Sequence, residues 1–129
     1  MIVVDTSVWV AALRSASGVE SEELRRLLDH DDVALVVVVK LEILAGARAR
    51  DRRRLRRLLS ALPIYVPEAG TWERIESWIE DAAASGERFG IGDLIVAGVA
   101  ADHGAPVWSL DSDFARMARL GLIDLHRSG

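Results

Sequence analysis

The chain has 129 residues, half of them hydrophobic and 28% charged, which is typical of one globular domain over residues 1–129. The lack of cysteine excludes disulfides, thiolate zinc sites and cysteine nucleophiles. No apolar run reaches the roughly 18 residues of a membrane span, and an acidic residue at position 5 argues against a signal peptide. We therefore expect a soluble, cytoplasmic protein without membrane contact.

The net charge of −4 conceals an uneven distribution. Arginine accounts for 15 of the 16 basic residues, and seven arginines fall between Arg48 and Arg57, where Asp51 is the only acid. The rest of the chain is therefore markedly acidic. A basic strip on an acidic protein bears on the partners that it binds rather than on its fold.

The first half of the chain alternates apolar runs with amphipathic segments. Residues 2–4 form a β-branched run that predicts a buried strand, and the polar residues after it favour a helix at 8–14. Leucines on one side of 20–28 predict an amphipathic helix. Residues 33–39 are apolar throughout, as expected for a second strand covered on both faces. Helices follow at 40–48 and 50–62, the second with an apolar stripe of Leu55, Leu58, Leu59 and Leu62.

The second half continues this alternation. It predicts a strand at 64–66, a helix at 71–85, an apolar helix from 91 to 101, a strand at 107–110 and a short helix starting at 111. Residues 122–125 are a candidate fifth strand. Strands alternating with helices predict an α/β fold, a three-layer sandwich in which helices flank a mainly parallel four- or five-stranded sheet.

Four carboxylates do not fit the polar side of an amphipathic helix, where most acids of this chain lie. They follow predicted strands or open an apolar helix, and they are Asp5, Glu42, Asp93 and Asp111. Parallel α/β sheets bind ligands at the carboxyl ends of their strands, so this topology would bring the four acids to one edge. Each acid taken alone could equally be a helix N-cap.

Four carboxylates in contact cannot all remain ionised without a counter-charge. The sequence places no arginine beside any of them; Arg88, five residues before Asp93, is as near as any. A divalent cation is the other source of positive charge, and an all-oxygen site suits Mg²⁺, or Mn²⁺, rather than Zn²⁺. Sites of this kind activate a bound water for attack on a phosphate.

At these positions the chain resembles the PIN-domain family, and within it the VapC-type toxins of bacterial toxin–antitoxin pairs. Four segments carry the resemblance in order along essentially the whole chain: Val3–Ser7, Leu41–Gly46, Ile91–Ala97 and Val107–Phe114. The resemblance implies a PIN-like fold and a Mg²⁺-dependent endoribonuclease toxin of a type II toxin–antitoxin system, which hydrolyses RNA phosphodiester bonds with a metal-activated water. It also implies a homodimer and a cognate antitoxin protein.

The resemblance also implies roles for single residues. The metal-binding and catalytic residues it implies are Asp5, Glu42, Asp93 and Asp111. Asp113 is an additional acid in a loop where family members vary in which acid faces the metal. Ser7 and Ser109 match positions where relatives carry a small polar residue beside the acids, with Ser109 in place of the more usual threonine.

Two further features have both a structural and a functional interpretation. Within the arginine run, Arg52, Arg53 and Arg54 either form the solvated side of a helix or contact RNA phosphates or an acidic antitoxin segment. Trp9 either packs in the core or stacks on an unpaired base. The spacing of Trp72 and Trp78 favours core or dimer-interface positions.

The main alternative function is a PIN-like module that has lost catalysis and only binds RNA or protein. The presence of all four acids argues against it. A receiver-like phosphoacceptor would need a lysine near a late strand, but Lys40 is the only lysine. A haloacid-dehalogenase-like phosphatase would need an aspartate two residues after Asp5, where Ser7 stands.

Overall fold

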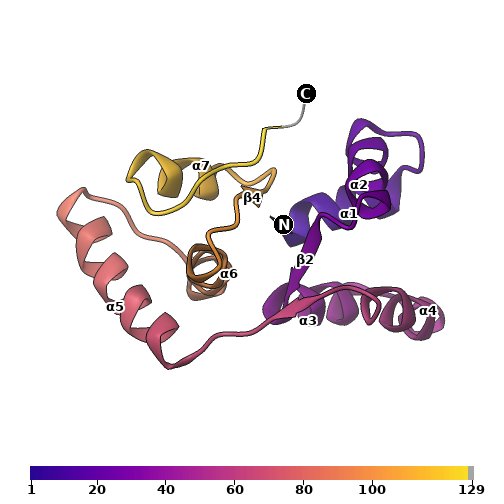
Figure 1. The fold of residues 1–129 in the computed structure, drawn as a ribbon, viewed down its shortest axis with the longest axis horizontal. Helices are drawn as coiled ribbons and strands as arrows, with labels where there is room; N and C mark the ends of the chain where they lie inside the picture. The colour runs from indigo at the N-terminus through magenta and orange to yellow at the C-terminus, as the bar shows by residue number, and fades with distance from the viewer. Residues whose placement is uncertain (128–129) are drawn as a thin grey trace.

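The structure, a computed structural model, describes residues 1–127; the last two residues of the expected 1–129 domain lie outside the described residues. Its centre is a parallel sheet of four strands in the order β3-β2-β1-β4 (Figure 1). The strands are β1 (Ile2–Val4), β2 (Val33–Val36), β3 (Ile64–Tyr65) and β4 (Val107–Trp108). The predicted α/β fold with a parallel sheet is therefore confirmed.

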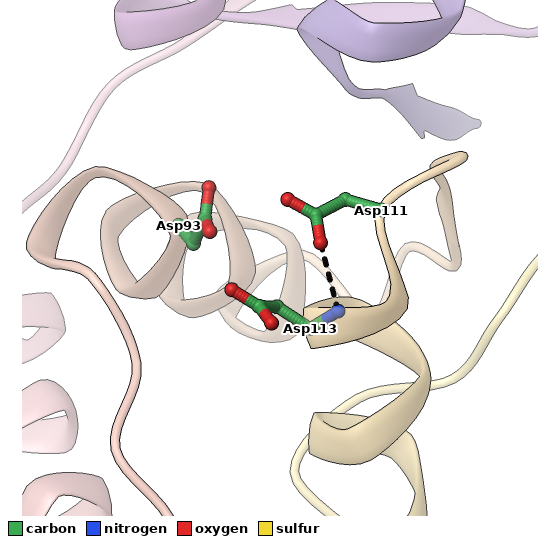
Figure 2. Close-up of side chains that lie close together, drawn as sticks. All are labelled: Asp93, Asp111 and Asp113. Carbon is green, nitrogen blue, oxygen red and sulfur yellow. Dashed lines mark hydrogen bonds between the residues drawn. The ribbon is translucent and has the colours of Figure 1, made fainter.

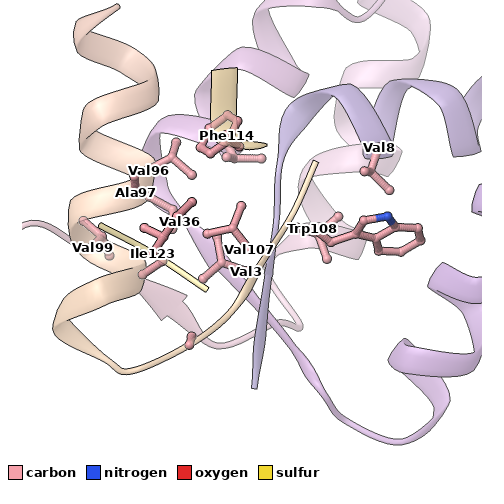
Figure 3. Close-up of a cluster of buried hydrophobic side chains, with 14 of the residues drawn as sticks. Val3, Val8, Val36, Val96, Ala97, Val99, Val107, Trp108, Phe114 and Ile123 are labelled. Atoms are coloured by element: carbon pink, nitrogen blue, oxygen red, sulfur yellow. The ribbon is translucent and has the colours of Figure 1, made fainter. Parts of the chain in front are cut away.

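Seven helices surround the sheet in the described part of the chain. They are α1 (Thr6–Arg14), α2 (Val19–Asp29), α3 (Val37–Gly46), α4 (Ala49–Leu59), α5 (Ala69–Ala84), α6 (Ile91–Asp102) and α7 (Ser112–Arg119). Val96 and Val99 of α6 pack on one side of the strands, while Val8 of α1 lies with Trp108 on the other (Figure 3). Because strand side chains alternate between faces, the short strands supply apolar contacts to both helix layers. Helix α5 packs against α6.

The predicted strand at 33–39 was wrong in its second half. β2 ends at Val36, and Val37–Gly46 is the helix α3. A run of valines favours a strand, but the helical penalty of a β-branched residue is well under 1 kcal/mol. Here the helical conformation places Val39 and Ile43 on one buried face, four residues apart. Glu42 consequently lies one and a half turns into a helix and not at a strand end.

Smaller differences concern the ends of elements. Helix α1 starts at Thr6, directly after Asp5, whereas the prediction placed its start at Val8. The candidate fifth strand is reduced to one bridge between Val107 and Leu125. Leu58 of the expected apolar stripe is 50% exposed. No helix of residues 1–127 is both long enough and apolar enough to cross a membrane.

Close packing fixes α6 against α5. A Cβ atom on Gly98 would lie 3.2 Å from Cγ1 of Ile75 and 3.3 Å from Cγ2 of Thr71, so glycine allows the two helices to approach. One turn further along α6, Asp102 accepts hydrogen bonds from Thr71 and from Arg74, the latter at 2.8 Å. This contact matters for function because α6 carries Asp93.

Candidate metal centre

Three aspartates form a compact group where α6 and α7 begin. Asp93 lies in the first turn of α6, Asp111 caps α7, and Asp113 lies in the first turn of α7. One carboxylate oxygen from each lies within 4.8 Å of the other two. The three side chains point toward a common space (Figure 2), and we call them the acidic triad. Helix N-termini suit this role because their free N–H groups favour negative charge.

Asp5 adjoins this group through two serines. Its side chain is only 6% exposed, and its Oδ2 accepts hydrogen bonds from Ser109 Oγ at 2.8 Å and from Ser7 Oγ at 2.9 Å. The Ser109 hydroxyl also accepts from the backbone N–H of Asp111 at 3.0 Å. These hydrogen bonds satisfy one oxygen of a buried carboxylate and connect the end of β1 to the start of α7.

Glu42 lies at the exposed margin of the site. Its Oε1 accepts a hydrogen bond from Thr6 Oγ1 at 3.0 Å, which ties α3 to the first residue of α1. Glu42 is not part of the compact triad. Of the four carboxylates singled out in the sequence, the structure therefore brings Asp93 and Asp111 into direct proximity, with Asp113 as the third member of the group.

Among the acids of the site, Asp93 has a raised pKa. Burial is the largest cause that raises its pKa, from 3.8 to about 6, and neighbouring carboxylates add to the effect. Those carboxylates, in falling order, are Asp5, Asp111, Asp113 and Glu42. Four acids thus lie close enough to disfavour the ionised form of Asp93, and the site is rich in negative charge.

The residues present fit a hard divalent cation. The donors that converge are carboxylate oxygens, with the Ser7 and Ser109 hydroxyls behind Asp5, and such donors suit Mg²⁺ or Mn²⁺. A cation would also relieve the repulsion that raises the pKa of Asp93. The capping and cluster interpretations are compatible, because Asp111 accepts the N–H of Asp113 at 2.9 Å through one oxygen while its carboxylate belongs to the triad.

Sequence reasoning missed the basic residue beside the triad. Arg116 forms ion pairs with Asp113 and with Glu87. Its spacing of three residues from Asp113 on a predicted helix is the usual signal of such a pair. Thr6, one of the polar residues that predict a helix start after residues 2–4, donates to Glu42, and the sequence pattern does not indicate this contact.

The residues predicted to contact RNA differ in their exposure and in their contacts. Trp9 is 3% exposed, so of its two interpretations the structure supports the core position and not stacking on a base. Arg52 donates to the carbonyls of Leu44 and Ala47 at 3.2 Å and so caps the end of α3. Arg53 and Arg54 are exposed. Trp78 is buried, as expected, whereas Trp72 is 50% exposed.

Comparisons with known proteins bear on the family and the fold of this chain. The family model of the PIN domain matches residues 2–120. Ribonuclease VapC11 of Mycobacterium tuberculosis and VapC ribonuclease Mb1587 of Mycobacterium bovis are each 33% identical to this chain, over 93% of both chains. The VapBC2 complex of Rickettsia felis, bound to a DNA fragment from its promoter, matches with a TM-score of 0.81 at 19% identity over 100% of both chains. For VapBC-5 of Mycobacterium tuberculosis the TM-score is 0.67 at 26% identity, over 98% of both chains.

Proposed function

The chain belongs to the PIN-domain family, and on that basis we propose that it is a Mg²⁺-dependent endoribonuclease, the toxin of a type II toxin–antitoxin pair. The observation that carries the proposal is the acidic triad, whose oxygens lie within 4.8 Å of one another, beside a buried Asp5. Relatives that are named VapC ribonucleases support the RNA substrate. The reaction is hydrolysis of a phosphodiester bond.

In this proposal the acids have different roles, according to their distance from the cation. Asp93, Asp111 and Asp113 would hold Mg²⁺, or Mn²⁺ in its place, with Asp5 and Glu42 adding charge around it. The bound cation supplies an activated water and stabilises charge on the attacked phosphate. Ser7 and Ser109 keep Asp5 in one orientation through hydrogen bonds to a single oxygen. Thr6 does the same for Glu42.

The direct experiment is RNA cleavage by the purified protein, with Mg²⁺ and with EDTA. We expect cleavage only with the cation. Removing a residue that only hydrogen-bonds to a metal ligand lowers activity by up to about a hundredfold. Asp93 is proposed to bind the metal directly, so Asp93→Asn should lower the cleavage rate by more than this. Asp81→Asn, which changes an exposed acid of α5, is the matched control and should cleave normally. Equal cleavage by the parent and Asp93→Asn would remove the catalytic assignment and favour a binding-only module.

The proposed partners are RNA, a cognate antitoxin and a second copy of the chain. A cavity of about 300 Å³ lies between α1, α3 and α4 and includes Glu42 at its edge. Val10 and Leu13 contribute apolar side chains to its lining. Arg54 also lines it, whereas Arg52 and Arg53 do not. We therefore place the contact with RNA or an acidic antitoxin segment at Arg54 first. Light scattering on the purified chain would test the homodimer; a monomer at all concentrations would refute it.

A further inference from the structure

Arg116 joins the two segments that carry the acidic triad. Its Nη2 donates to Oδ1 of Asp113 in the first turn of α7. Its Nη1 donates to Oε2 of Glu87, four residues before α6 begins. The guanidinium carbon also lies 5.2 Å from the centre of the Phe89 ring. One side chain thus links the start of α7 to the segment that leads into α6.

This link acts on the geometry that a cation would need. The triad is assembled from two helix starts that are distant in sequence, Asp93 on one and Asp111 with Asp113 on the other. Phe89 is 7% exposed and so anchors the leading segment in the core. The side chains of Arg116, Glu87 and Asp113 are 28–32% exposed, which reduces solvent screening of their charges. The planar guanidinium can engage two carboxylates at fixed angles, as an ammonium group cannot.

We propose that Arg116 is a positioning residue of the cation site: by joining Asp113 to Glu87, it fixes the distance between the starts of α6 and α7. This inference rests on the proposed function. Because Arg116 engages Oδ1 of Asp113, it restricts the orientation of a carboxylate that belongs to the triad. Glu87 and Phe89 act indirectly, because they hold the guanidinium of Arg116 in place.

A simpler role for Arg116 is that of a counter-charge, and the two roles predict opposite results. Removing only a positive charge would make the site more negative and would tighten the binding of a cation. Removing a tether would let the two helix starts separate and would weaken binding. Arg116→Met keeps most of the side-chain length and deletes the charge, so it separates the two roles.

The experiment is a calorimetric titration of the full chain with Mn²⁺ alone. We expect Arg116→Met to weaken Mn²⁺ binding by about tenfold or more, the effect of losing an outer partner of a metal ligand. Arg116→Lys should not restore binding, and Glu87→Gln should weaken it to a smaller extent. Arg119→Met, which removes an arginine from the last turn of the same helix, is the matched control and should bind as the parent does. Equal or tighter binding by Arg116→Met would overturn the inference and leave the proposed function intact.

A second readout needs no metal. Arg88 lies between Glu87 and Phe89, the two residues of the leading segment that Arg116 contacts. Loss of these contacts should loosen the segment, so trypsin should cleave after Arg88 faster in Arg116→Met than in the parent or in Arg119→Met. Unchanged cleavage there would overturn the tether. If the parent binds no Mn²⁺, both the proposed function and this inference are refuted. If the parent binds Mn²⁺ and Arg116→Met binds it equally well, only the positioning role of Arg116 is refuted.

Discussion

Replacing Asp93 by asparagine should stabilise the protein when no metal is present. The folded state raises the pKa of this carboxyl from 3.8 to about 6, so folding favours its protonated form. Between these two pKa values the folded state binds more protons than the unfolded state, and its stability falls as pH rises. Above pH 6 the ionised Asp93 destabilises the fold. The full shift corresponds to about 3 kcal/mol, and screening of a partly exposed group reduces it to about 1–2 kcal/mol.

The assay is urea unfolding of the parent and Asp93→Asn in EDTA, at pH 4 and at pH 7.5. At pH 7.5 the variant should be more stable by about 1–2 kcal/mol, because it lacks the unfavourable charge. At pH 4 the difference should nearly vanish, because Asp93 is mostly protonated in the folded parent. Adding Mg²⁺ at pH 7.5 should stabilise the parent more than the variant, by mass action. A variant that is no more stable than the parent at pH 7.5 in EDTA would refute the electrostatic account.

Two other substitutions test the helix packing and the basic strip. Gly98→Val should lower the free energy of unfolding by about 1–3 kcal/mol, because its side chain would overpack the contact between α5 and α6; Gly46→Ala, where a Cβ meets nothing within 4 Å, is the control. Arg54→Gln should weaken RNA binding in EDTA and lower the magnitude of the slope of log affinity against log salt by about 1. Arg53→Gln, outside the cavity, should leave both nearly unchanged; equal effects of the two would argue against the cavity as the RNA contact.

The sequence predicts the sheet well because apolar β-branched runs bounded by polar residues have few other stable arrangements. It fails after Val36, where the choice between strand and helix depends on which face is buried, and burial is a property of the whole fold. The same limit applies to Trp9. Its position four residues after Asp5 suggests proximity to the site, but the direction of its side chain depends on where α1 begins.

The site could be predicted in outline but not in its organisation. Helix starts at Asp93 and Asp111 follow from the local sequence, and the parallel topology brings them to one edge of the sheet. The grouping of Asp113 with these two, ahead of Glu42, depends on the relative placement of α6 and α7. That placement rests on contacts between residues far apart in the chain, such as Arg116 with Glu87. Spacing alone carries no information on such contacts.

Ser109 tests whether the hydroxyl groups behind Asp5 matter to the site. Its Oγ donates to a buried carboxylate at 2.8 Å and accepts the N–H of Asp111 at 3.0 Å, so one atom connects two of the acids. Ser109→Ala leaves Asp5 with one hydroxyl donor fewer and should cost about 1–3 kcal/mol of stability. It should also weaken Mn²⁺ binding by about 10–100-fold. Ser109→Thr keeps the hydroxyl, so a threonine variant as impaired as the alanine variant would show that the side-chain volume, and not the hydrogen bond, is what this position requires.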